Sequence, residues 1–227
     1  MTADFFRGKI YKIVAGCIAT LFTAFCFGYA LFLSRAKTVE VNRGFFYLVR
    51  AETNVEVGVE FVKLEGGAGY LIRQNGIDFV VLSVYLSEND ALSVQANMQS
   101  GEKTPIMYVG VKTLYFKTRK EKKNADVCVG ALDVLYGYIG VFNDVIARLE
   151  DGATQESVKR ILSPIGRQFA FLSTKYTQMY PAFAFFCRGV SERIERYCEK
   201  ILFVGDLRYE LCAMTEGYLT LARAFSI

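Results

Sequence analysis

The feature that most constrains this chain is an uncharged, mostly apolar run from Ile13 to Leu33. The run holds 21 residues without a single Asp, Glu, Lys, Arg or Pro. As an α-helix it would be roughly 31 Å long, which matches the hydrocarbon core of a bilayer. Basic residues flank both ends, and Tyr11 and Tyr29 stand where interfacial aromatic side chains are common. The run therefore predicts a single transmembrane helix.

Two other interpretations of this run remain open. A cleaved signal peptide usually has an apolar core of only about 7–15 residues, although Ser34, Arg35 and Ala36 could form a cleavage site. A buried helix of a globular protein would normally keep a polar stripe. We expect a retained anchor in the cell membrane, with a cytoplasmic stub over residues 1–12 and residues 34–227 outside the cell. Three basic residues near each end leave the orientation weakly determined by charge.

The composition excludes several kinds of chemistry. The 227 residues contain no histidine, which removes Ser-His-Asp and Cys-His catalysis and His-ligated zinc. The six cysteines form no C-x-x-C pair. Cys17 and Cys26 lie in the apolar run, and we expect the other four to pack in the core. A net charge of +4 indicates no nucleic-acid partner. We therefore expect no cofactor, no metal and no catalytic residue, although a glycosidase needing two carboxylates alone stays an alternative.

After a linker over residues 34–43, residues 44–118 show a strand-like pattern interrupted by two short helices. Apolar runs predict strands over 45–51, 68–73, 77–86 and 105–117. Asn54 and Ser87 are placed to cap the helices, and Asn75-Gly76 is a hairpin turn. The order βαββαβ predicts an α+β domain, of ferredoxin-like order, with both helices on one face of the sheet.

From residue 125 to 227 the apolar spacing changes to alternating steps of four and three, which predicts a bundle of about four helices. These helices could also associate with a second copy or another protein. Residues 119–124 are predicted to be a basic linker, since Lys117–Lys123 holds five basic residues and one acidic residue. The predicted fold class is an N-terminal single transmembrane helix, then the βαββαβ domain, then an all-α helical bundle.

The segment Asp78–Met98, DFVVLSVYLSENDALSVQANM, resembles the second half of a SPOR domain. Val80 and Leu82 match core positions of that family, and Tyr85 matches its aromatic position. Ser87 matches the helix cap, and Ala91 matches the alanine of the helix. The order and size of residues 45–117 also fit the family's fold. The first half departs from the family pattern, because it lacks the Gly-x-Phe that follows the first strand.

The resemblance implies binding to peptidoglycan glycan strands without stem peptides, in division or sporulation of a bacterium. The binding surface would be the sheet face opposite the helices, where sugar rings pack on aromatic side chains. The residues expected on that face are Tyr47, Arg50, Tyr70, Phe79, Val81 and Ser83. Alternatively, the helical bundle covers this face, and a degenerate SPOR-like fold makes protein–protein contacts in a scaffold of an envelope complex. An RNA-binding βαββαβ domain is disfavoured, because the third strand lacks that fold's basic-aromatic signature.

Overall fold

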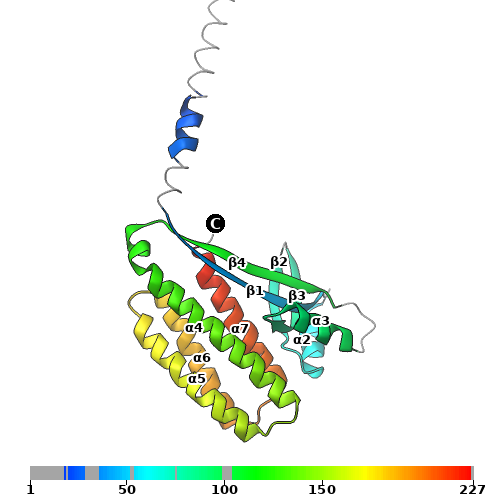
Figure 1. Ribbon diagram of the computed structural model, residues 1–227. Helices are drawn as coiled ribbons and strands as arrows, with labels where there is room; N and C mark the ends of the chain where they lie inside the picture. Colours follow the sequence, from blue (N-terminus) through cyan, green and yellow to red (C-terminus); the bar gives the residue numbers. More distant parts are fainter. Residues whose placement is uncertain are drawn as a thin grey trace, which may run out of the picture. The chain divides into compact units, whose positions relative to one another are not determined.

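The sheet strands and their two short helices precede four longer helices along the chain (Figure 1). The computed structural model describes residues 18, 20–28, 36–51, 54–74, 76–98 and 104–225. Residues 20–28 are helical. The labelled elements are β1 (Lys37–Ala51), α2 (Val55–Leu64), β2 (Tyr70–Gln74), β3 (Ile77–Tyr85), α3 (Glu88–Asn97), β4 (Ile106–Phe116), α4 (Arg119–Glu150), α5 (Gln155–Tyr176), α6 (Pro181–Glu199) and α7 (Val204–Arg223).

The chain divides into two compact units. One comprises Met1–Val39 and Tyr115–Asp126, and the other comprises Glu40–Leu114 and Val127–Ile227. The second unit contains most of the sheet together with α2, α3, α5, α6 and α7. The sheet and the helices that follow it are therefore parts of one packed body in this unit.

The four strands form an antiparallel sheet in the order β2-β3-β1-β4. β2 and β3 form a hairpin in which Gln74 pairs with Ile77. Gly76 lies in this turn with a φ of +80°, a conformation that glycine adopts without steric cost. The short loop fixes the register of the hairpin and so decides which side chains share a face.

A bulge interrupts the pairing of β1 with β3. The neighbours Leu48 and Val49 on β1 pair with Ser83 and Val81 on β3, which leaves Leu82 as an extra residue. An extra residue in one strand shifts the alternation of side chains beyond it. Positions on β3 before and after Leu82 therefore do not follow one simple in–out pattern.

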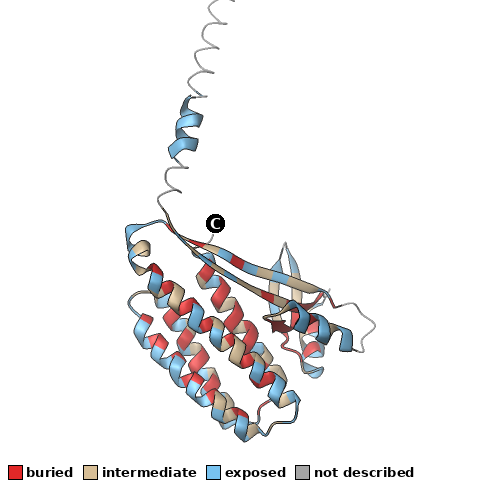
Figure 2. Ribbon diagram, in the orientation of Figure 1, coloured by how far each residue is buried: buried red, intermediate tan, exposed pale blue. Residues whose placement is uncertain are grey.

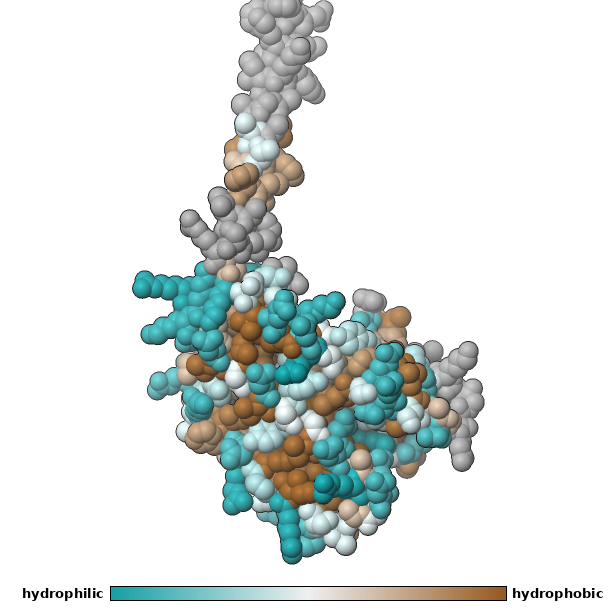
Figure 3. Space-filling view, in the orientation of Figure 1, coloured by the Kyte–Doolittle hydropathy of each residue, from teal (hydrophilic) through white to brown (hydrophobic). Residues whose placement is uncertain are grey.

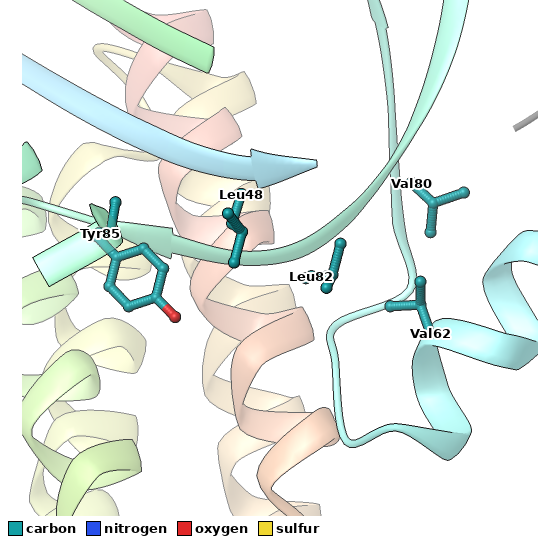
Figure 4. Close-up of a cluster of buried hydrophobic side chains, with 6 residues drawn as sticks. Leu48, Val62, Val80, Leu82 and Tyr85 are labelled. Carbon is teal, nitrogen blue, oxygen red and sulfur yellow. The ribbon is translucent and has the colours of Figure 1, made fainter. Parts of the chain in front are cut away.

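Helices α2 and α3 cover one face of the sheet. Val80, Leu82 and Leu48 from the strands pack there with Val62 of α2 and Ala91 of α3 (Figure 4). Burial of Val80 and Leu82 under these helices confirms the prediction made from the alternating pattern. This small apolar cluster anchors both helices to the sheet, because each buried side chain contributes roughly 1.5–3 kcal/mol.

Helix α7 covers the opposite face. It packs against β3 and β2, and the ring of Tyr209 meets that of Tyr70 with a centroid distance of 5.1 Å. Tyr47 and Val81, which lie on this face, are fully buried. An apolar sheet face cannot stay solvated at low cost, so the sheet is sandwiched between two layers of helix.

The helices α4 to α7 bury one side each, as Figure 2 shows by the buried stripes along them. Gly152, with a φ of +88°, separates α4 from α5, and the Thr154 side chain caps α5 by accepting from the Ser157 amide. α5 and α6 approach closely at Gly166, where a Cβ would lie 3.0 Å from Ile194. The Ser191 hydroxyl donates to the Gly166 carbonyl over 2.8 Å at this crossing.

The other unit contains the start of α4. The Thr118 hydroxyl accepts from the Glu121 amide, and the Glu121 carboxylate accepts from the amides of Lys117 and Thr118. These reciprocal bonds form a capping box, which starts a helix. The residues predicted as a basic linker, 119–124, are therefore the first turns of α4. The high charge of these residues led to the prediction of a linker in place of a helix.

The predicted fold class is wrong. Within the described residues there are seven helices and a four-stranded antiparallel sheet, and one helix is long and apolar enough to cross a membrane. That helix is α4, inside the chain and not at its N-terminus, and 39% of its apolar window is buried in the structure. Core helices of soluble proteins pass the same test. Of the predicted span Ile13–Leu33, only residues 18 and 20–28 are described; the stub 1–12 lies outside the described residues.

Candidate functional site

The six residues predicted for glycan binding do not share one open face. Strand pairing places Tyr47, Tyr70, Phe79 and Val81 on the face that α7 covers, while Arg50 and Ser83 lie on the face of α2 and α3. The bulge at Leu82 turns Ser83 away from Phe79 and Val81, and Arg50 faces away from Tyr47 because the two are three positions apart on β1. Tyr47, Val81, Arg50 and Ser83 are buried, and Tyr70 and Phe79 are half-buried. Glycan binding through these residues stays a prediction, and it would require the helices on both faces to leave the sheet.

Arg50 belongs to the packing between β1 and α2. Its guanidinium lies over the ring of Phe61, with 5.0 Å from Cζ to the ring centroid. A nitrogen of the same group is 3.7 Å from a carboxylate oxygen of Glu65. Stacking on an aromatic ring and pairing with a carboxylate are typical of a structural arginine.

Tyr47 links the sheet to α7. Its hydroxyl donates to the Glu216 carboxylate over 2.7 Å, and 169 positions separate the two residues in the chain. Burial raises the pKa of Tyr47 far above its usual range, and the negative charge of Glu216 adds to this effect. The hydroxyl therefore stays protonated and acts as a hydrogen-bond donor at every physiological pH.

A cavity of about 570 Å³ lies between α6 and α7, beside the start of β2 at Tyr70. Its wall is mostly apolar and aromatic, and it includes Phe183, Phe186 and Phe225. The ionisable groups of the wall are Tyr70, Tyr180, Arg193 and Glu216. Burial raises the pKa of Tyr70 to about 12, so its hydroxyl is neutral. Pockets of this size and character are typical binding sites for small organic molecules.

The charge of Arg193 is already satisfied inside the protein. Two of its nitrogens donate to the two carboxylate oxygens of Glu210, at 2.6 and 2.9 Å. Glu210 is fully buried, and burial raises the pKa of its carboxyl while the bonds from Arg193 oppose that rise. The same bonds raise the pKa of Arg193. This bidentate pair joins α6 to α7 next to the cavity.

A second feature is an exposed apolar patch at α2, which we call the α2 patch. It comprises Val57, Phe61 and Leu64, with exposed fractions of 61%, 48% and 87%, together with exposed Phe203 from the connection between α6 and α7. The spacing of Val57, Phe61 and Leu64 places them in one stripe along the helix. Leu64 and Phe203 line the same cavity of about 550 Å³. Figure 3 shows that apolar side chains also gather in patches on one face of the protein.

The α2 patch is held in place by contacts between α2 and the start of α7. Arg208 donates to the Gly66 carbonyl over 2.8 Å and to the Glu150 carboxylate over 2.5 Å. A Cβ on Gly205 would lie 3.0 Å from the carbonyl oxygen of Gly67, so the two backbones nearly touch. These contacts fix Leu64 relative to Phe203.

Three of the described cysteines pack as apolar side chains. Cys128, Cys187 and Cys212 are buried, and burial raises the pKa of the first two to about 11 and about 12. Thiols with raised pKa values are poor nucleophiles. Within the part of the chain that the structure describes, no three His, Cys, Asp or Glu side chains are grouped to hold a metal ion.

The sequence analysis missed both the cavity and the α2 patch. The patch had a local signal, since Val57, Phe61 and Leu64 repeat at helical spacing on a predicted helix, whose other side buries Val62. The cavity had none, because it depends on how α6, α7 and β2 meet. Comparisons with protein-family models, with curated proteins and with solved structures found no match to this chain. The resemblance to the SPOR family therefore stays a prediction.

Proposed function

We propose that this protein is a structural component of an assembly that acts by binding another protein, and that it is not an enzyme. The observation that carries this proposal is the exposed and rigidly held α2 patch, while α7 covers the sheet face on which a glycan would bind. Contiguous apolar side chains on a surface are typical of protein interaction sites.

The charges around the α2 patch favour one kind of partner. Glu60 and Glu56 flank the apolar stripe of α2 on one side, while Glu65 on the other side is paired with Arg50. An amphipathic helix with apolar residues at matching spacing and lysine or arginine at its edges would complement this surface. The partner we propose is therefore a basic amphipathic helix of another protein.

We place this assembly at the cell membrane, as the sequence predicts. The exposed apolar side chains of residues 20–28, such as Phe22 and Phe25, are consistent with a contact between this segment and lipid. A membrane location with residues 34–227 outside the cell is part of the proposal. If the proposal is right, protease added to intact wall-stripped cells will digest residues 34–227.

Photo-crosslinking in the cells that make the protein tests the proposal. A photoreactive residue replacing Leu64 should give one discrete crosslinked protein, which mass spectrometry then identifies. The same residue replacing Leu92, which is exposed on α3 outside the patch, serves as the matched control. The identified partner should contain a basic amphipathic helix, and Phe61→Glu should abolish the crosslink while leaving the melting temperature unchanged.

Two results would contradict the proposal. Equal crosslinking from Leu64 and Leu92 would mean that the α2 patch has no special role. Sedimentation of the purified protein with glycan stripped of stem peptides, at unchanged strength in Phe61→Glu, would favour glycan binding instead.

A further inference from the structure

We propose that the cavity between α6 and α7 binds a small organic cation, namely an amine attached to an apolar body. This site is separate from the α2 patch, so the inference does not depend on the proposed function. It rests on the shape of the cavity, on its aromatic wall and on the Glu216 carboxylate, which forms no ion pair within the described residues.

The size and wall of the cavity suit an apolar ligand body. Its volume of about 570 Å³ lies within the range for drug-sized ligands. Phe183, Phe186 and Phe225 supply aromatic faces, and Met179 and Leu221 supply flexible apolar side chains. Moving the apolar surface of a ligand from water onto this wall is favourable.

The electrostatics of the cavity favour a positive head group. Arg193 is neutralised by its two bonds to Glu210, so this pair adds no net charge. Glu216 also lines the cavity, and its carboxylate accepts a hydrogen bond from the neutral hydroxyl of Tyr47. No ion pair to Glu216 exists within the part of the chain that is described.

The negative charge of Glu216 affects the pKa values of two neighbouring side chains. Its negative charge helps to raise the pKa values of Tyr70 and Cys212, although burial is the larger cause for both. An ammonium group near Glu216 would gain a charge-assisted hydrogen bond and contact with the aromatic rings. A carboxylate ligand would meet repulsion at the same place.

Isothermal titration calorimetry on the full chain tests this inference with a phenylalkylamine as the probe. The alcohol and the carboxylate of the same carbon skeleton are the comparison probes. We expect the amine to bind with one site per chain, the alcohol more weakly, and the carboxylate not at all. Concentrations stay below those at which the probes aggregate.

Two variants and one matched control locate the binding. Glu216→Gln should weaken amine binding by about tenfold or more, which is the size of one charge-assisted hydrogen bond, and should leave alcohol binding unchanged. Glu192→Gln removes the same charge from an exposed position of α6 outside the cavity and should change nothing. Ala182→Trp places a large side chain at an exposed position of the wall and should abolish binding of both probes.

Melting temperatures of all three variants show whether each is folded, and Ala182→Trp remains informative if Glu216→Gln is unstable. The inference is overturned if amine and alcohol bind equally and Glu216→Gln has no effect. It is also overturned if Ala182→Trp binds the amine as the unchanged protein does, because the probe then binds elsewhere.

Discussion

Replacing Tyr47 by Phe removes one hydroxyl from the contact between β1 and α7 and keeps the aromatic ring. That hydroxyl donates to the Glu216 carboxylate over 2.7 Å, and the side chain is fully buried. Because the ring still fills its place, no cavity forms, and the change tests the hydrogen bond alone. We expect Tyr47→Phe to lower the free energy of unfolding while leaving the fold intact.

The size of the effect follows from the environment of the two groups. A hydrogen bond to a charged group contributes about 1.5–3 kcal/mol to stability. Glu216 is only half-buried and lines a cavity, so water can solvate its carboxylate after the hydroxyl is lost. We therefore expect a loss of about 1.5 kcal/mol, near the lower end, which corresponds to roughly 3–6 °C in melting temperature for a chain of this size.

Urea unfolding followed by circular dichroism measures the change, with Tyr108→Phe as a control for an exposed tyrosine. A double-mutant cycle with Glu216→Gln isolates the energy of the pair. The reasoning is refuted if Tyr47→Phe costs less than about 0.5 kcal/mol, or if its effect adds independently to that of Glu216→Gln. Either result would mean that α7 is not held on the sheet by this bond.

Three further predictions concern the core, the buried ion pair and alkaline pH. Leu82→Ala should cost about 2–5 kcal/mol in urea unfolding through the cavity that it creates under α2, and a cost near zero would contradict its burial. Arg193→Met should cost about 2–4 kcal/mol at neutral pH because it leaves Glu210 buried without its partner. This cost should shrink as the pH falls, since Glu210 then binds a proton; a pH-independent cost would argue against a charged Glu210. Burial raises the pKa values of Tyr47 and Tyr218, so the unfolded chain loses protons first: stability should be complete below about pH 10 and fall above it, with tyrosine ionisation coinciding with unfolding. Ionisation of Tyr47 and Tyr218 at a pH well below that of unfolding would disprove this prediction.

Several local elements could be predicted from the sequence because their signals lie within a few residues. Asn54 accepts from the Val57 amide at the start of α2, as its position indicated. Gly76 lies in the hairpin between β2 and β3, and the apolar spacing of residues 125–227 corresponds to helices that each bury one stripe. The capping box at Thr118 was equally local, but the surrounding charges led to its interpretation as a linker.

The candidate site could not be predicted in the same way. Sequence alternation alone assigns every second residue of β3 to one face, and the bulge at Leu82 breaks that rule. Ser83 therefore faces away from Phe79 and Val81. Arg50 was also expected on an open face, whereas it lies three positions from Tyr47 on β1, on the opposite face, and stacks on Phe61 of α2. For the α2 patch, the helical spacing of the apolar residues could be read from the sequence. That spacing did not indicate which side of the helix stays exposed.

The sequence by itself determined where the chain turns, where helices begin and which side chains must be buried. These properties depend on backbone geometry and on the hydrophobic effect, which act residue by residue. Only the tertiary structure decided what buries them: α7 covers the second face of the sheet through Tyr47 and Glu216, which stand 169 positions apart. Pairings over such distances depend on the shapes and charges of whole packed surfaces, and no local pattern in the chain encodes them.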